Sequence, residues 1–246
     1  MASKKSRKGK SLKRTDLQTE ITCCTPLETK LIDVDGSLSI SPPPSKIILS
    51  EGWRGLRLEK IEYTTKGLMF TADNFLSVKE CEQWIRFAEA ATFVQVVQRR
   101  THEFALREHG RLQIIDNEIA EKIYSRLQNL IPADISGSQP VCCSPNIRLY
   151  RYCPGERFGK HIDESTLDER SGCMSKLTVL IYFSNHCEGG ETLFYTGRND
   201  ETLVLSVAPV MGRLLVHEHG AKCLTHEGSP VHDGVKFVLR TDVVYS

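Results

Sequence analysis

The segment from residue 146 to residue 163 reads NIRLYRYCPGERFGKHID. Its first seven residues, 146–152, are dominated by Ile, Leu, Tyr and Arg, and the apolar and aromatic members of this set are common in strands. Pro154 and Gly155 follow and favour a turn. The segment therefore predicts a short strand that ends in a turn.

Six more short runs with strand-like composition follow this strand, separated by glycine or proline residues. The predicted strands are 146–152, 176–183, 191–195, 202–207, 212–217, 221–226 and 235–245. Two predicted helices precede them, together with shorter strand-like runs near 56–61 and 68–70. This order of elements predicts an α+β fold, in which an antiparallel double-sheet barrel is braced by helices.

The two predicted helices carry start signals and apolar stripes. Ser77 and Glu80 form a capping-box pattern at the start of a helix predicted over 77–91. Asp116 is the predicted N-cap of a second helix over 117–131. The stripes consist of Val78, Cys81, Trp84, Ile85 and Ala88 in the first helix and Ile119, Ile123, Leu127 and Leu130 in the second.

The composition is that of an ordinary globular protein, with 40% hydrophobic and 26% charged residues among 246. A net charge of +1 gives no overall attraction to nucleic acid or membranes. No apolar run approaches the roughly 18 residues needed to cross a bilayer. Nine cysteines without a Cys-x-x-Cys pair argue against a zinc module or a disulfide framework. We expect a soluble cytoplasmic or nuclear protein.

The N-terminal part differs in character from the rest. Its first 14 residues include seven Lys or Arg and no acid, which predicts disorder. A solvated tail is the simplest interpretation; a nuclear address or a contact with an acidic partner are the alternatives. Residues 1–50 are predicted to form this tail and a Pro/Ser linker, with Ser-Pro-Pro-Pro at 41–44. The folded domain is predicted over 51–246.

A candidate metal site begins with His161 and Asp163. In extended backbone, residues i and i+2 point the same way, so an imidazole and a carboxylate at this spacing can bind one metal ion. A His-x-Asp pair on a solvated loop looks the same, so the pair alone is weak evidence. A second histidine would complete the two-histidine, one-carboxylate set that suits non-haem Fe(II) and O2 chemistry. The downstream candidates are His217, His219, His226 and His232.

The positions of basic residues select among these four histidines. An enzyme that uses 2-oxoglutarate needs a buried cation to pair with the far carboxylate of that cosubstrate. Only His226 is followed by such cations on a predicted strand, with Lys236 ten residues later and Arg240 fourteen residues later. Lys236 and Arg240 share one face of that strand, so either or both could reach the barrel interior. The positions ten residues after the other three histidines hold Glu227, Ser229 and Asp242.

Three ordered segments of the chain are similar to motifs of one enzyme family. They are RLYRYCPGERFGKHID at 148–163, LTVLIYF at 177–183 followed by EGGET at 188–192, and HEGSPVHDGVK at 226–236. The sequence resembles the prolyl 4-hydroxylase-like branch of the 2-oxoglutarate and Fe(II)-dependent dioxygenases over about residues 146–246, and more loosely from residue 52. The resemblance implies a double-stranded β-helix, a jelly-roll or cupin-like barrel, with its core at 141–246 and helical support at 51–140.

The same resemblance implies roles for individual residues. His161, Asp163 and His226 would bind Fe(2+). Lys236 matches the residue that pairs with the C5 carboxylate of 2-oxoglutarate. Tyr152 and Thr178 match positions that hydrogen-bond this cosubstrate, although either residue would also suit the core of a strand. The implied cofactors are Fe(2+), 2-oxoglutarate and O2, with ascorbate as a further candidate.

Two departures from the family pattern leave alternatives open. The last strand reads Leu239-Arg240-Thr241-Asp242-Val243-Val244-Tyr245 where the family usually has an aromatic residue, so Arg240 could share or take over the role of Lys236. His217 and His219 stand where the family usually has an apolar or aromatic run. They are either a second metal-capable pair or a polar strand end.

The leading functional hypothesis is a hydroxylase that acts on a protein side chain, with proline as the first candidate. Oxidative demethylation of nucleic acid is the alternative, supported by the basic tail and by a basic stretch before the barrel. A catalytically silent barrel that binds a partner is a third hypothesis. The basic stretch either lines a substrate groove or is a solvated surface; it comprises Arg99, Arg100, His102, Arg107 and Arg111. The sequence assigns no oligomeric state.

Overall fold

The computed structural model of the protein describes residues 57–60, 67–184, 186–196 and 202–246. The tail and linker predicted over 1–50 lie outside these residues. Within the described part, no helix combines the length and the apolar character that a membrane span requires.

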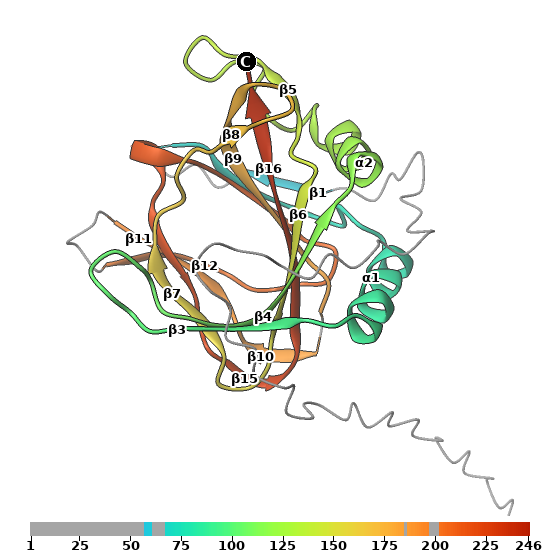
Figure 1. Ribbon diagram of the computed structural model, residues 1–246, viewed down its shortest axis with the longest axis vertical. Coiled ribbons are helices and arrows are strands. Elements are labelled where there is room, and N and C mark those ends of the chain that lie inside the picture. Colours follow the sequence, from blue (N-terminus) through green and yellow to red (C-terminus); the bar gives the residue numbers. More distant parts are fainter. Residues whose placement is uncertain (1–56, 61–66, 185, 197–201) are drawn as a thin grey trace, which may run out of the picture.

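Eight strands form the two facing layers of the double-stranded β-helix, which confirms the predicted fold class (Figure 1). One layer has the order β13-β9-β16-β6 and the other the order β7-β14-β11-β12, and strand β4 pairs with both β6 and β7. The bounds are β6 (Asn146–Tyr152), β7 (Arg157–His161), β9 (Cys173–Tyr182), β11 (Thr192–Tyr195), β12 (Leu203–Val207), β13 (Leu214–Glu218), β14 (Thr225–Gly228) and β16 (Lys236–Tyr245).

The remaining strands extend the layers or form a small separate sheet. Residues 51–140 were expected to supply helical support, but they also add strands, including an antiparallel hairpin of β3 and β4 that continues the layer of β6. Strands β10 and β15 pair only with each other in the described residues. The bounds are β1 (Arg57–Lys60), β2 (Met69–Asp73), β3 (Val94–Gln98), β4 (Arg107–Ile115), β5 (Pro140–Cys143), β8 (Leu167–Asp168), β10 (Cys187–Gly189) and β15 (Val231–Gly234).

Both predicted helices are present, and both lie on the same side of the curled sheet in Figure 1. Helix α1 (Val78–Ala90) begins with the predicted capping box, in which Ser77 and Glu80 bond to each other's backbone N–H. Helix α2 (Asn117–Leu127) has Asp116 as its N-cap. It ends at Leu127, before the predicted residue 131, and a turn follows in which the N–H of Leu130 donates to the carbonyl oxygen of Leu127 at 2.8 Å.

One predicted strand was wrong in its first half. Residues 221 and 222 of the run 221–226 belong to a short 3₁₀ helix, η1 (Gly220–Lys222), and β14 starts only at Thr225. Gly220 has a φ of +67°, a left-handed conformation that glycine adopts without steric cost and that interrupts an extended strand.

The strands of the first layer separate an apolar core on the helix side from a barrel interior in which charged groups adjoin a second, smaller apolar cluster. Because side chains alternate across a strand, Phe237 and Leu239 of β16 face the helices, whereas Lys236 and Arg240 face the other way. On the helix side, Trp84 of α1 stacks on Phe183 with ring centroids 5.5 Å apart. The polar groups of the interior are therefore held on strands whose opposite faces are anchored in a packed core.

Glu80 joins the two helices, and we predict that its loss destabilises the fold. Its buried carboxylate accepts hydrogen bonds from Ser77 and forms an ion pair with Arg126 of α2 at 2.7 Å. Glu80→Ala should lower the free energy of unfolding by about 3 kcal/mol in urea denaturation, because the largely buried guanidinium of Arg126 loses the carboxylate of Glu80. Glu82→Ala, which removes an exposed carboxylate from the same helix, should cost less than about 0.5 kcal/mol. Equal losses would contradict this account.

Candidate metal centre and cosubstrate pocket

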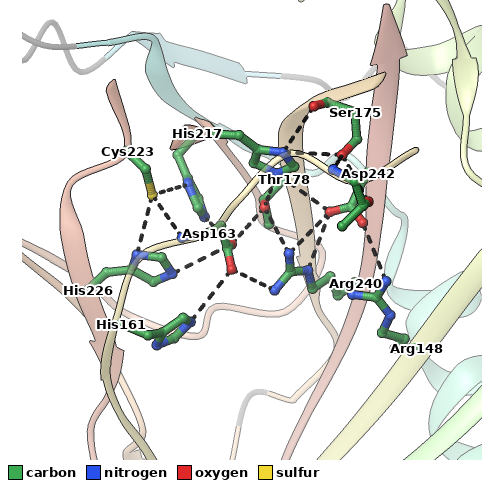
Figure 2. A network of polar contacts seen from close by, with 12 residues as sticks. Arg148, His161, Asp163, Ser175, Thr178, His217, Cys223, His226, Arg240 and Asp242 are labelled. Carbon is green, nitrogen blue, oxygen red and sulfur yellow. Dashed lines mark hydrogen bonds and ion pairs between the residues drawn. The ribbon is translucent and has the colours of Figure 1, made fainter. Parts of the chain in front are cut away.

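The structure brings together the three predicted metal ligands. Strand β7 pairs with β14 so that His161 lies directly opposite His226, and Asp163 follows two residues after the end of β7. One ligand atom from each of the three residues lies within 4.8 Å of the other two. Figure 2 shows the carboxylate of Asp163 between the two imidazoles on one side and Arg240 on the other.

Hydrogen bonds to backbone carbonyls orient both imidazoles. Nδ1 of His161 lies 2.9 Å from the carbonyl oxygen of Gly159, and Nδ1 of His226 lies 3.0 Å from that of Leu224. A carbonyl can only accept, so both Nδ1 atoms carry the proton and both Nε2 atoms offer a lone pair. Each Nε2 lies 3.7 Å from a carboxylate oxygen of Asp163. This arrangement is typical of metal-binding histidines.

The charge states of the three side chains also fit a metal. Burial lowers the pKa of His161 to about 3, and it likewise lowers the pKa of His226. Burial raises the pKa of Asp163, but nearby positive charge, chiefly that of Arg240, outweighs it and holds that pKa well below its usual value. At neutral pH the site therefore presents two neutral imidazoles and one carboxylate, the forms that a metal ion requires.

A second group, His217, Cys223 and His226, also has its ligand atoms within 4.8 Å. Here Cys223 Sγ lies 3.8 Å from Nδ1 of His217 and 3.9 Å from Nδ1 of His226, and the latter nitrogen carries a proton. Burial raises the pKa of the Cys223 thiol to about 12, so it is not a thiolate at neutral pH. The set of His161, Asp163 and His226 is therefore the better metal site.

His217 and His219 do not form a metal-binding pair with each other among the described residues. Nε2 of His217 is buried without a hydrogen-bond partner and lies 3.5 Å from Asp163. Nε2 of His219 lies 2.7 Å from the hydroxyl of Thr178 and 3.7 Å from Asp242. Each histidine thus contacts a different carboxylate.

Arg240 contacts the metal-ligand carboxylate directly. Its guanidinium donates to Asp163 at 2.9 Å and to Asp242 at 3.3 Å, and Asp242 lies 3.6 Å from Arg148. Burial lowers the pKa of Arg240, but the two carboxylates outweigh it and raise that pKa. Arg240 is therefore a permanent cation whose position is set by Asp163 and Asp242.

Lys236 lies in the same cavity as the metal ligands but has a different environment. Its side chain is 3% exposed, and Nζ donates to the carbonyl oxygen of Gly190 at 2.6 Å. Within the described residues it forms no ion pair with a carboxylate. The cavity is lined by Tyr150, Tyr152, Phe158, His161, Asp163, Leu180, Tyr182, Thr192, His226, Gly228, Lys236, Val238 and Arg240. A buried, unpaired ammonium facing this cavity fits a carboxylate ligand.

The two predicted hydrogen-bonding residues lie in different places. Tyr152 lines the cavity, with its ring 5.0 Å from Nζ of Lys236. Thr178 is not among the lining residues; its hydroxyl donates to Asp163 at 2.7 Å. Its assignment to the cosubstrate stays a prediction, and the contact favours a role in holding Asp163.

Tyr182 and Thr192 are among the lining residues to which the sequence assigned no role. The hydroxyl of Tyr182 lies 2.6 Å from that of Thr192, and the ring of Tyr182 lies 5.6 Å from Nζ of Lys236. Strand alternation could have found Tyr182, because Thr178, Leu180 and Tyr182 share one face of β9.

A double-stranded β-helix that holds two histidines, one carboxylate and a buried cation defines the class of non-haem iron oxygenases that use 2-oxoglutarate. Residues 147–241 match the model of the 2OG-Fe(II) oxygenase superfamily, and this range includes the three predicted metal ligands, Lys236 and Arg240. The match confirms the resemblance over these residues, and this superfamily implies Fe(2+), 2-oxoglutarate and O2 as cofactors. A search of curated proteins found no match.

Solved structures of prolyl hydroxylases are similar to this chain. One from Trichoplax adhaerens, in complex with a peptide fragment of the hypoxia inducible factor oxygen degradation domain, has a TM-score of 0.55 at 18% identity, covering 73% of this chain and 84% of its own. A viral collagen prolyl hydroxylase from Paramecium Bursaria Chlorella virus-1 has a TM-score of 0.49 at 19% identity, covering 72% and 95%. At 18% identity, the similarity to the Trichoplax adhaerens structure shows the fold alone.

We predict that metal binding depends on His161 and not on Cys223. His161→Ala should weaken binding of Co(II), used as a spectroscopic substitute for Fe(II), by at least about 100-fold, because it removes one of three protein ligands. Cys223→Ser should bind Co(II) as the wild-type protein does. The measurement is the visible absorption of Co(II) during titration. Loss of binding in Cys223→Ser with retention in His161→Ala would show that the metal lies in the other group.

Proposed function

We propose that this oxygenase domain hydroxylates a C–H bond of a protein side chain, with proline as the first candidate. The observation that carries the proposal is the shared cavity, which has the candidate iron ligands and the unpaired ammonium of Lys236 in its lining. When Fe(II) and 2-oxoglutarate are bound, they activate O2 and oxidise a C–H bond, with release of CO2 and succinate.

Each residue of the cavity has a task that follows from its contacts. Lys236 would bind the C5 carboxylate of 2-oxoglutarate, because a charge-assisted hydrogen bond offsets the cost of burying both charges. The hydroxyls of Tyr182 and Thr192 lie in the same lining and would add neutral hydrogen bonds. Leu180 and Val238 supply apolar walls that exclude water from the reacting atoms.

Arg240 has a task distinct from that of Lys236. Its guanidinium is already paired with two carboxylates, Asp163 and Asp242, whereas Lys236 has no carboxylate partner among the described residues. We therefore assign the cosubstrate carboxylate to Lys236 and the orientation of the metal-ligand carboxylate to Arg240.

The choice of a peptide substrate rests on the Trichoplax adhaerens prolyl hydroxylase, whose fold is similar and whose structure contains a bound peptide. Ascorbate belongs to the proposal as a reductant that would keep the metal in the Fe(II) state.

The proposed activity predicts slow formation of succinate by the purified protein with Fe(II), 2-oxoglutarate and O2, even without a substrate. Asp163→Ala should abolish this turnover, because the metal loses its carboxylate ligand. Asp233→Ala, which removes an exposed carboxylate from β15, should retain it. The absence of succinate from the wild-type protein would favour a silent binding module.

A second prediction concerns the pH dependence of cosubstrate binding. Burial lowers the pKa of Lys236 to about 8, so its ammonium loses a proton as the pH rises through that value. Bound 2-oxoglutarate favours the protonated, charged form of Lys236. Above pH 8 this form becomes tenfold rarer per pH unit in the free protein, so the Kd for 2-oxoglutarate should rise about tenfold per pH unit. The measurement is calorimetry with Mn(II) in place of Fe(II). Lys236→Arg should flatten the profile, because guanidinium does not titrate in this range. A flat wild-type profile would contradict the assignment of Lys236.

A further inference from the structure

The predicted basic stretch divides into two groups in the structure. Arg99, Arg100 and His102 are exposed on the loop between β3 and β4. Arg107 and Arg111 lie on β4 itself and are half-buried. Their positions alternate with buried Leu112 and Ile114 of the apolar core, so they lie on the face of β4 that continues the polar barrel interior.

Strand pairing places these arginines next to the cavity lining. Arg107 is paired with Phe158, Arg111 with Tyr150, and Arg148 with Arg240. Paired residues in antiparallel strands have Cα atoms about 4.5 to 5.5 Å apart. The second member of each pair lines the cavity. Arg107, Arg111 and Arg148 thus form an arginine row, in which each residue lies on the strand next to a residue that lines the cavity.

Two members of this row lack a carboxylate partner in the described part of the chain. The guanidinium of Arg107 lies over the ring of Phe158 at 4.8 Å, and that of Arg111 donates to the neutral side chain of Gln113 at 3.2 Å. The Nε atoms of Arg107, Arg111 and Arg148 are all buried without a hydrogen-bond partner. Buried N–H donors without an acceptor destabilise a folded protein, unless a ligand accepts their hydrogen bonds.

The charges around the row do not cancel. Arg148 and Arg240 share the carboxylates of Asp163 and Asp242, and this part of the network is balanced. Arg107 and Arg111 add two positive charges that have no acidic partner there. Burial lowers the pKa of Arg111, and the positive charges of Arg148, Arg107 and Arg240 lower it further, so these guanidinium groups lie close enough to Arg111 to repel it. An anionic ligand would relieve this repulsion.

We propose that Arg107, Arg111 and Arg148 form an entrance that binds acidic side chains of a peptide substrate, on either side of the residue that is oxidised. The proposal rests on the proposed function and names the substrate class. Arg107 and Arg111 are four residues apart on one strand, about 13 Å, which matches two side chains four residues apart in an extended peptide.

A peptide fits this entrance better than nucleic acid does. Binding of single-stranded nucleic acid uses exposed aromatic rings on which bases stack. Among the described residues, Phe104 is the one aromatic side chain found exposed, at 43%. The unpaired guanidinium groups are half-buried along one strand and do not form an outer surface track for a phosphate backbone.

The test is binding of fluorescein-labelled 12-residue peptides with a central proline to the protein loaded with Mn(II) and N-oxalylglycine. Three peptides differ only at two positions, four residues apart, that flank the proline. Both positions hold Glu in the first peptide, Gln in the second and Lys in the third. The Glu peptide should bind at least tenfold more tightly than the Gln peptide, and the Lys peptide most weakly. Arg111→Gln and, separately, Arg107→Gln should each weaken binding of the Glu peptide about tenfold and leave the affinity for the Gln peptide within twofold.

Arg86→Gln is the matched control, because it removes an equal charge from the exposed face of α1. It should bind all three peptides as the wild-type protein does. The melting temperature of each variant shows whether it is folded. If Arg111→Gln does not fold, Arg107→Gln provides the test.

Equal affinity for the three peptides would overturn the proposal. A 12-nucleotide single-stranded RNA that binds more tightly than the Glu peptide, and whose binding is lost in Arg107→Gln and Arg111→Gln, would also overturn it. Failure of every peptide to bind a protein that forms succinate would also overturn it and leave the oxygenase function intact. Selective binding of the Glu peptide by a protein that forms no succinate would support the entrance and overturn the oxygenase function.

Discussion

The pairing of β7 with β14 is the constraint on which the candidate site depends. It places His161 opposite His226 at a fixed backbone distance, and Asp163 completes the set because it lies two residues beyond the strand end. Backbone carbonyls of Gly159 and Leu224 then fix the orientation of the two rings. Sheet register therefore positions the candidate metal centre, and the backbone needs no rearrangement to bring the predicted ligand atoms together.

The alternation of side chains along β16, β9 and β6 connects this centre to the rest of the fold. One face of each strand packs against α1 and α2, and the other carries the charged and aromatic groups of the barrel interior. Burying Asp163, Arg240 and Asp242 would be costly for isolated charges, but each of them is paired. Lys236 forms no ion pair with a carboxylate in the described part of the chain, and its ammonium faces the cavity where a dicarboxylate cosubstrate would bind.

Much of this arrangement could be predicted from the sequence. Strand β6 was predicted with its observed bounds, and the capping box of Ser77 and Glu80 marked the start of α1, because these signals are local. The hairpin of β3 and β4 was missed. In β4 the inward positions hold Arg107, His109 and Arg111, so the strand lacks the apolar run by which the other strands were recognised.

The division of labour between Lys236 and Arg240 could not be read from the sequence either. Both side chains point from the same face of β16, and strand periodicity treats them alike. What separates them is the neighbour that each meets across the barrel. Arg240 meets Asp163, which is 77 residues away in the chain, and Lys236 meets the carbonyl oxygen of Gly190.

The most direct test of this account is a crystal structure of the protein with Mn(II) and 2-oxoglutarate, with the metal located by its anomalous scattering. The account predicts Mn(II) bound by Nε2 of His161, Nε2 of His226 and one oxygen of Asp163, and the C5 carboxylate of 2-oxoglutarate at Nζ of Lys236. A metal bound by His217 and Cys223, or a C5 carboxylate bound to Arg240 with Lys236 left unpaired, would contradict it.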